Sequence, residues 1–251
     1  GMGLPGNGTV PAVESRRIQL AKDAGRQVMA CLERGIRPSD VMTEDAFRNA
    51  FTVDMALGGS TNTVLHLIAI AHEAGIEFPL EELNAISQKT PHLCRMSPVA
   101  GGHHIQDLDR AGGIPAVTKE LVDVGLINVD ARTVTGRSVG ENVEQATLHN
   151  REVIRSPQDP YSASGGLAIL FGNLAPDGAV IKTAAVPKDK RVYRGPARVF
   201  DSEDAATKAI LAKDFDRGDV IVIRYEGPKG GPGMREMLTP TSVLSGMGMD
   251  G

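Results

Sequence analysis

The sequence is poor in aromatic residues, with no Trp, three Tyr and six Phe in 251 residues. Proteins that bind single-stranded nucleic acid usually stack its bases on aromatic side chains, so that class of function is disfavoured. The formal net charge of −4 indicates the same, because nucleic acids and anionic membranes attract positively charged surfaces. We therefore expect neither a nucleic acid nor a membrane as partner.

Cysteine is scarce as well. Cys31 and Cys94 are the two cysteines of the sequence, and neither belongs to a CxxC pair. A disulfide framework is therefore not expected, and the default setting is a reducing cytoplasm. Cys31 lies within an apolar helical run and is predicted to be a small buried hydrophobe. No apolar run reaches 18 residues and no signal peptide is visible, so we expect no membrane span.

The remaining composition, with 41% hydrophobic and 23% charged residues, is that of an ordinary globular chain. A length of 251 residues predicts one or two domains. Hydrophobic periodicity predicts a helix-rich domain over 1–153, a turn-rich linker over 154–166 and a β-rich domain over 167–251. Helices are expected over 11–35, 43–57, 60–71, 80–87, 114–124, 141–148 and 202–213. Strands are expected over 167–171, 179–183, 197–200 and 220–225.

Several of these boundaries have local signals. Thr43, with Glu44 and Asp45 after it, is predicted to cap the second helix, and Gly58-Gly59-Ser60 to end it and cap the third. That third helix is apolar on most of its surface and is predicted to be well buried.

Four strands are too few to close a barrel or to bury both faces of a sandwich. The chain also begins within a glycine-rich turn and ends just after a helix-like run. We therefore expect it to be part of a longer protein.

Some motifs have plain structural interpretations. Residues 1–6 match GxGxxG, but no strand precedes them and Pro5 interrupts them, so a tight turn is favoured over a dinucleotide site. The histidines show no zinc-binding spacing, and His104 with Asp107 is predicted to form a local hydrogen bond at a helix start. The basic residues between Lys182 and Arg198 fit either an anion site or a solvated face.

Two glycine-rich segments are candidates for ligand binding. Gly58-Gly59 lets a ligand approach the backbone, and Ser60, Thr61 and Asn62 lie at a helix start that favours anions. Residues 224–237 place four glycines and two prolines after a strand, with exposed backbone N–H groups and a carboxylate that suits a divalent metal. A structural turn explains the second segment equally well.

Together the motifs are specific. They are Leu-Pro-Gly-Asn-Gly-Thr at 4–9, Gly-Gly-Ser-Thr-Asn at 58–62, Pro-His-Leu-Cys at 91–94, Ala-Gly-Gly at 111–113, Gly-Asn-Leu-Ala-Pro at 172–176, Gly-Pro-Ala at 195–197 and the long run at 225–237. With them the chain resembles, over essentially its whole length, the dihydroxy-acid and 6-phosphogluconate dehydratase family, and within it the dihydroxy-acid branch.

The resemblance implies an α/β fold: the later part of a helix-rich α/β N-terminal domain, then the first part of a β-barrel-like C-terminal domain. It also implies a chemistry, in which an iron–sulfur cluster and Mg²⁺ remove water from a 2,3-dihydroxy acid and the resulting enol becomes a 2-keto acid. The substrate would be a small dihydroxy acid, and the complete enzyme a homodimer.

When the resemblance is applied residue by residue, few of the family's cofactor-binding and catalytic residues fall within this chain. Its cluster cysteines would precede Gly1, so none is expected in this chain and Cys94 is predicted to be structural. Its serine base would follow Gly251. Glu236 matches a Mg²⁺ ligand, and the candidates for substrate binding are Met234, Ser60, Thr61 and Asn62.

Two alternatives stay open. One is an aldonate or 6-phosphogluconate dehydratase of the same family. The other is a non-catalytic module that keeps the glycine-rich loops to bind an anionic ligand.

Overall fold

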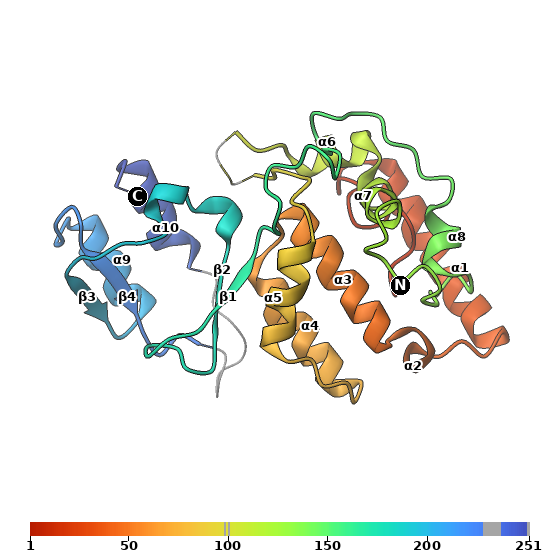
Figure 1. The fold of residues 1–251 in the computed structure, drawn as a ribbon, viewed down its shortest axis with the longest axis horizontal. Coiled ribbons are helices and arrows are strands. Elements are labelled where there is room, and N and C mark those ends of the chain that lie inside the picture. The colour runs from red at the N-terminus through yellow and green to blue at the C-terminus, as the bar shows by residue number, and fades with distance from the viewer. Residues whose placement is uncertain (98, 100, 228–236, 250–251) are drawn as a thin grey trace. The chain divides into compact units, whose positions relative to one another are not determined.

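The computed structural model of the chain describes residues 1–97, 99, 101–227 and 237–249. These residues form two compact units, Gly1–Val186 and Pro187–Gly251. Figure 1 shows the elements of both. In the described part of the chain, none of the helices is both long and apolar enough to cross a membrane.

The first unit consists mainly of helices. Its elements are α1 (Ser15–Glu33), α2 (Pro38–Val41), α3 (Glu44–Leu57), α4 (Thr61–Glu73), α5 (Leu80–Lys89), α6 (Ile105–Ala111), α7 (Gly113–Val122), α8 (Val139–Val143), β1 (Ala168–Leu170), β2 (Ala179–Ile181) and the 3-10 helix Thr183–Ala185. Strands β1 and β2 pair antiparallel, with Ala168 opposite Ile181.

Helix α3 is central to this unit, and Figure 1 shows it between α4 and α5 on one side and α7 on the other. It contributes to two apolar clusters. The first cluster joins α3 to α6 and α7 and includes Ala56, Leu93, Cys94, Leu108, Val117, Leu121 and Ile154. The second joins α3 to α4, α5 and β1 and includes Phe47, Phe51, Met55, Val64, Phe78, Leu83, Leu167 and Ile169. Because α3 is buried on two faces, it holds the turn that follows it in a fixed position.

The predicted caps at both ends of α3 are confirmed. The Thr43 hydroxyl accepts a hydrogen bond from the Ala46 N–H at 3.3 Å. Gly58 ends the helix with a φ of 62°, a left-handed conformation that favours glycine. Ser60 begins α4 by accepting the Asn62 N–H at 3.2 Å. The predicted helix-start bond of Asp107 is also present, since its Oδ2 accepts the His104 N–H at 2.9 Å.

Other expectations about helices were wrong. Helix α1 begins at Ser15, four residues after Pro11, and has no buried residue. Cys31 is half-buried rather than buried, because it lies on this exposed helix. Helix α4 buries only Val64 and Ala71, since it packs along one stripe against α3 and β2.

The helix expected over 141–148 is the shorter α8, because the capping residue lies earlier. Ser138 and Glu141 form a capping box, in which the Ser138 N–H donates to Glu141 Oε2 at 2.7 Å and the Glu141 N–H to Ser138 Oγ at 3.2 Å. The helix therefore begins at Val139 and ends at Val143. Helix α2 was not predicted, and of α6 only the start at His104 was, because each is too short to show a hydrophobic period.

The second unit is built on a strand–helix–strand arrangement. Its elements are the 3-10 helix Lys188–Lys190, β3 (Ala197–Phe200), α9 (Glu203–Leu211), β4 (Val220–Ile223) and α10 (Leu238–Gly246). Strands β3 and β4 are parallel, in register from Ala197–Val220 to Phe200–Ile223, with α9 as their connection. Helix α10 packs against α9.

The combination of helices and strands confirms the expected α/β class. Among the described residues the strands form two separate two-stranded sheets, so the barrel-like closure stays a prediction. The predicted domain division at 153 with a linker over 154–166 also stays a prediction. The first compact unit includes β1 and β2 because the backbone before them bonds to it, with Gly165 N–H donating to Ser87 O at 2.8 Å and Gly166 N–H to Met55 O at 3.0 Å.

Candidate functional site

The turn between α3 and α4 contains the predicted ligand residues Ser60, Thr61 and Asn62. Ser60 is exposed, and Thr61 and Asn62 are half-buried in the first turn of α4. The amino end of this 13-residue helix carries a partial positive charge from its backbone N–H groups. This partial charge favours an anionic ligand, and contact of the turn with such a ligand stays a prediction.

Asp54 lies under this turn and was not singled out by sequence reasoning. Its residue surface is 8% exposed. Burial raises the pKa of Asp54 to about 6, although hydrogen bonds from the Thr63 side chain and the Ser60 backbone, and the charge of Lys182, act to lower it. Asp54 Oδ2 is buried without a hydrogen-bond partner among the described residues. A buried carboxyl with this pKa at a candidate site is typical of functional residues.

His92 lies on the other side of the same turn. It is 5% exposed, and its Nε2 atom has no hydrogen-bond partner in the described part of the chain. Burial is the largest cause that lowers the pKa of His92, while a hydrogen bond with the Cys94 backbone raises it. Its ring centroid is 5.7 Å from that of Tyr161. His92 therefore stays uncharged at neutral pH and adds a polar atom beside Gly58.

Both glycines of the turn leave room for these side chains. A Cβ on Gly58 would lie 2.3 Å from His92 Nε2, and a Cβ on Gly59 would lie 1.8 Å from Asp54 Oδ1. Any larger residue would displace the side chains or the turn. The double glycine thus serves close packing of polar groups from within the chain, in addition to the left-handed cap at Gly58.

Lys182, in the segment after β2, is a further ionisable side chain near this turn. It is half-buried; burial lowers the pKa of Lys182, and the charge of Asp54 raises it. Sequence reasoning grouped Lys182 with the basic residues up to Arg198. The structure separates them, because Lys182 belongs to the first compact unit and the others, from Lys188 on, to the second. Within the first unit, Lys182 contributes its charge to the α3–α4 turn.

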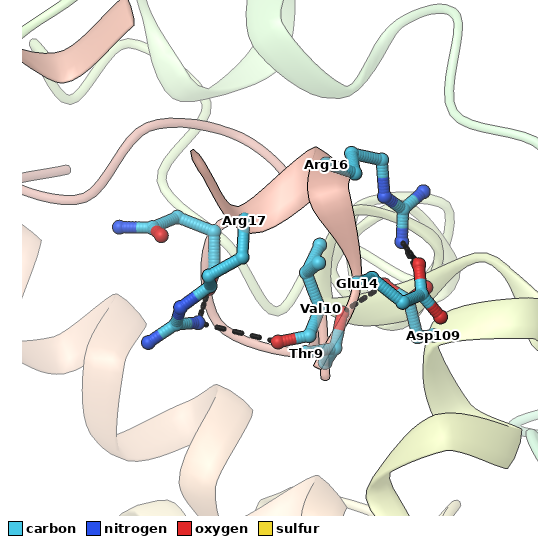
Figure 2. Close-up of polar contacts among 7 residues, drawn as sticks. Thr9, Val10, Glu14, Arg16, Arg17 and Asp109 are labelled. Carbon is cyan, nitrogen blue, oxygen red and sulfur yellow. Dashed lines mark hydrogen bonds and ion pairs between the residues drawn. The ribbon is translucent and has the colours of Figure 1, made fainter. Parts of the chain in front are cut away.

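The glycine-rich turn near the N-terminus is fixed by a second polar group, which Figure 2 shows. Thr9 is 2% exposed and donates to Asp109 Oδ1 at 2.8 Å, and the Arg16 guanidinium also contacts Asp109. Arg17 donates to the Val10 carbonyl at 3.3 Å. Residues 1–6, which match GxGxxG, include a bend at Gly3 and a turn at Pro5 and Gly6, and the predicted tight turn is confirmed.

Met234 and Glu236, the other predicted site residues, lie outside the described residues. A magnesium ligand at Glu236 therefore stays a prediction.

The cysteines do not fit an iron–sulfur cluster, which requires several thiolates close together. Cys94 is fully buried in the first apolar cluster, and burial raises the pKa of its thiol to about 12. Cys31 lies on α1 with its Sγ 3.1 Å from the Val134 carbonyl oxygen. The described residues contain no group of three or more His, Cys, Asp or Glu side chains arranged to hold a metal. The prediction that Cys94 is structural agrees with this burial.

We expect Cys94 to resist thiol reagents in the native protein. With a pKa of about 12, roughly one thiol in 10⁵ is ionised at pH 7, and only the thiolate reacts. Maleimide labelling followed by peptide mass analysis should modify Cys31 first and Cys94 only after addition of denaturant. Equal labelling rates under native conditions would contradict the buried position.

Comparison with known proteins agrees with the motifs. A sequence model described as dihydroxy-acid/6-phosphogluconate dehydratase N-terminal matches residues 1–142, and the corresponding C-terminal model matches residues 152–251. The chain therefore belongs to the dihydroxy-acid/6-phosphogluconate dehydratase family.

Individual relatives are similar over the whole chain. It is 62% identical over 250 residues to the dihydroxy-acid dehydratases of Caldanaerobacter subterraneus subsp. tengcongensis and Desulfatibacillum aliphaticivorans, covering 100% of this chain and 45% of each relative. It is 58% identical over 250 residues to that of Dehalococcoides mccartyi strain 195, covering 100% of this chain and 44% of the relative. The chain thus spans less than half the length of these relatives.

Proposed function

We propose that the full-length protein is a hydro-lyase that converts 2,3-dihydroxy-3-methyl acids into 2-keto acids in valine and isoleucine synthesis. The observation that supports this proposal is the 58–62% identity, over the entire chain, to proteins named dihydroxy-acid dehydratase. The alternative substrates are the sugar acids of the 6-phosphogluconate branch, which the family description includes.

In this proposal the first turn of α4 contacts the substrate. Ser60 and Thr61 carry hydroxyl groups, Asn62 carries an amide, and all three lie where the helix favours negative charge. A dihydroxy acid presents a carboxylate and two hydroxyl groups, which match such donors and acceptors. Lys182 adds positive charge near the same turn.

The proposal includes an iron–sulfur cluster and Mg²⁺ as cofactors, as the resemblance implies. The described residues do not fit the cluster, and the one implied Mg²⁺ ligand, Glu236, lies outside them. A cytoplasmic location is part of the same proposal, in keeping with two unpaired cysteines. The proposal also takes the full-length protein to be a homodimer, as the resemblance implies.

A substrate panel tests the proposal. The full-length protein, reconstituted anaerobically with iron, sulfide and Mg²⁺, is offered 2,3-dihydroxy-3-methyl acids, gluconate and 6-phosphogluconate, and 2-keto acids are measured. We expect turnover of the branched dihydroxy acids to exceed that of the sugar acids by at least about tenfold in kcat/KM, a difference of about 1.4 kcal/mol in transition-state binding. Preference for a sugar acid would assign the protein to the alternative branch.

A further inference from the structure

Asp54 is a buried carboxyl that the proposed chemistry leaves without a role. It lies on the same stripe of α3 as Phe47 and Phe51, both buried in the second apolar cluster. Residues on such a stripe are usually apolar, because an ionised group loses its hydration there. The presence of an acid at this position therefore needs an explanation.

The charge of Asp54 costs stability. Its pKa is about 6 in the folded protein and 3.8 in an unfolded chain, so the folded state binds the proton more tightly. Between these two values the folded state carries more protons than the unfolded state, and stability falls as the pH rises. Above pH 6 the penalty is complete, and a difference of about two pKa units corresponds to roughly a hundredfold change in the unfolding equilibrium.

What the carboxylate gains is contact with the start of α4. The carboxylate lies directly against the turn, since a Cβ on Gly59 would overlap Asp54 Oδ1. Hydrogen bonds from the Ser60 backbone and the Thr63 side chain lower its pKa, at the end of the helix that attracts negative charge. The carboxylate also attracts the Lys182 ammonium, which comes from a distant part of the sequence. One carboxylate thus interacts with two segments that bear candidate ligand groups.

We propose that Asp54 is a positioning residue of the ligand site at the start of α4, where its carboxylate holds the Ser60–Thr63 turn and Lys182 in the arrangement that receives the ligand. This inference rests on the proposed function for the identity of the ligand, a hydroxy acid. Asp54 itself is buried and is not proposed to touch it.

His92, Lys182 and Arg95 are further ionisable groups near the turn. His92 lies beside Gly58 and is affected by the charges of Lys182 and Arg95. The segment Ser60–Thr63 contains no ionisable side chain. Burial lowers the pKa of His92, which favours its neutral form, and raises the pKa of Asp54 to about 6. The Asp54→Asn variant separates the two groups, because it removes the titration of Asp54 and keeps that of His92.

The first test uses the Asp54→Asn variant of the chain. Asn keeps the size and one acceptor oxygen but removes the charge. We expect its unfolding equilibrium constant at pH 8 to be lower than that of the wild type by up to roughly a hundredfold, with the two converging below pH 4. Asp107→Asn is the matched control, because Asp107 also accepts a backbone N–H at a helix start; removing its charge there should not stabilise the chain at pH 8.

The Ser60 amide provides a local readout. In the wild type its proton chemical shift, and that of the Lys182 ammonium, should titrate with a midpoint near pH 6, and both titrations should vanish in Asp54→Asn. Shifts that do not titrate near pH 6 in the wild type would overturn the proposal, whatever the protein catalyses.

The second test uses activity of the full-length protein. A positioning role predicts that the KM of the wild type falls as the pH rises through 6. The KM of Asp54→Asn should be at least about tenfold higher than that of the wild type and should not change around pH 6. Its kcat should change less than its KM. Asp107→Asn should keep the wild-type KM. An Asp54→Asn variant with wild-type KM at every pH would overturn the role. If the wild type dehydrates no acid of the panel, the proposed function and a hydroxy acid as the ligand are both contradicted. The Ser60 titration then still decides whether Asp54 positions the turn.

Discussion

Replacing Glu236 by Gln in the full-length protein should reduce turnover by orders of magnitude and raise the Mg²⁺ concentration needed for half-maximal rate. From the sequence, Pro228 and Pro232 are expected to stiffen the segment, and its glycines to let the backbone pass close to a ligand. A carboxylate in such a segment suits Mg²⁺, which prefers oxygen ligands and is held by one or two protein carboxylates. Gln keeps the size and one acceptor oxygen but loses the charge that binds the cation.

The competing explanation is that Glu236 only pairs with a surface neighbour such as Arg235, an interaction worth at most about 1 kcal/mol. In that case Glu236→Gln should have near wild-type activity and Mg²⁺ dependence. Rates measured across a Mg²⁺ titration separate the two explanations, and the melting temperature without Mg²⁺ serves as the control for folding. Normal turnover at limiting Mg²⁺ would remove Glu236 from the site.

Replacing Gly166 by Ala should destabilise the first compact unit by about 3 kcal/mol, which lowers its melting temperature by about 6–12 °C. A Cβ on Gly166 would lie 2.3 Å from the Gly58 Cα, which is backbone and cannot rotate away. The segment that leads to Lys182 would have to move off the α3–α4 turn, and the bond from the Gly166 N–H to Met55 O would lengthen from 3.0 Å.

Gly172→Ala is the matched control. Its Cβ would have no atom within 4 Å, and Gly172 is not among the residues with positive φ. We expect its stability to stay within about 0.5 kcal/mol of the wild type. Thermal unfolding followed by circular dichroism measures both variants, and equal melting temperatures would mean that the close contact between Gly166 and Gly58 does not constrain the fold.

Local signals predicted much of the secondary structure. The strand expected over 197–200 is β3, and Thr43 and Ser60 are the caps of α3 and α4. These features depend on residues two or three positions apart, whose side chains bond to nearby backbone. The length of α8 was predicted less well, because the capping box of Ser138 and Glu141 was not recognised.

Part of the candidate site could also be found in the sequence. The glycine-rich motif at 58–62 identified the turn, and the long motif at 225–237 identified Glu236. One further signal was available: Asp54 follows Phe47 by seven residues and so falls on the apolar stripe of a predicted helix, where a charged residue is exceptional.

By itself the sequence determined the class of fold, the helix ends around the α3–α4 turn and the resemblance to a family, because each depends on local patterns or on contiguous motifs. Only the tertiary structure brought His92 and Lys182 to that turn, which Asp54 precedes in helix α3, and burial is the largest cause of the pKa shifts of all three. Burial and the approach of distant segments depend on how the helices pack, and no short-range pattern contains that information.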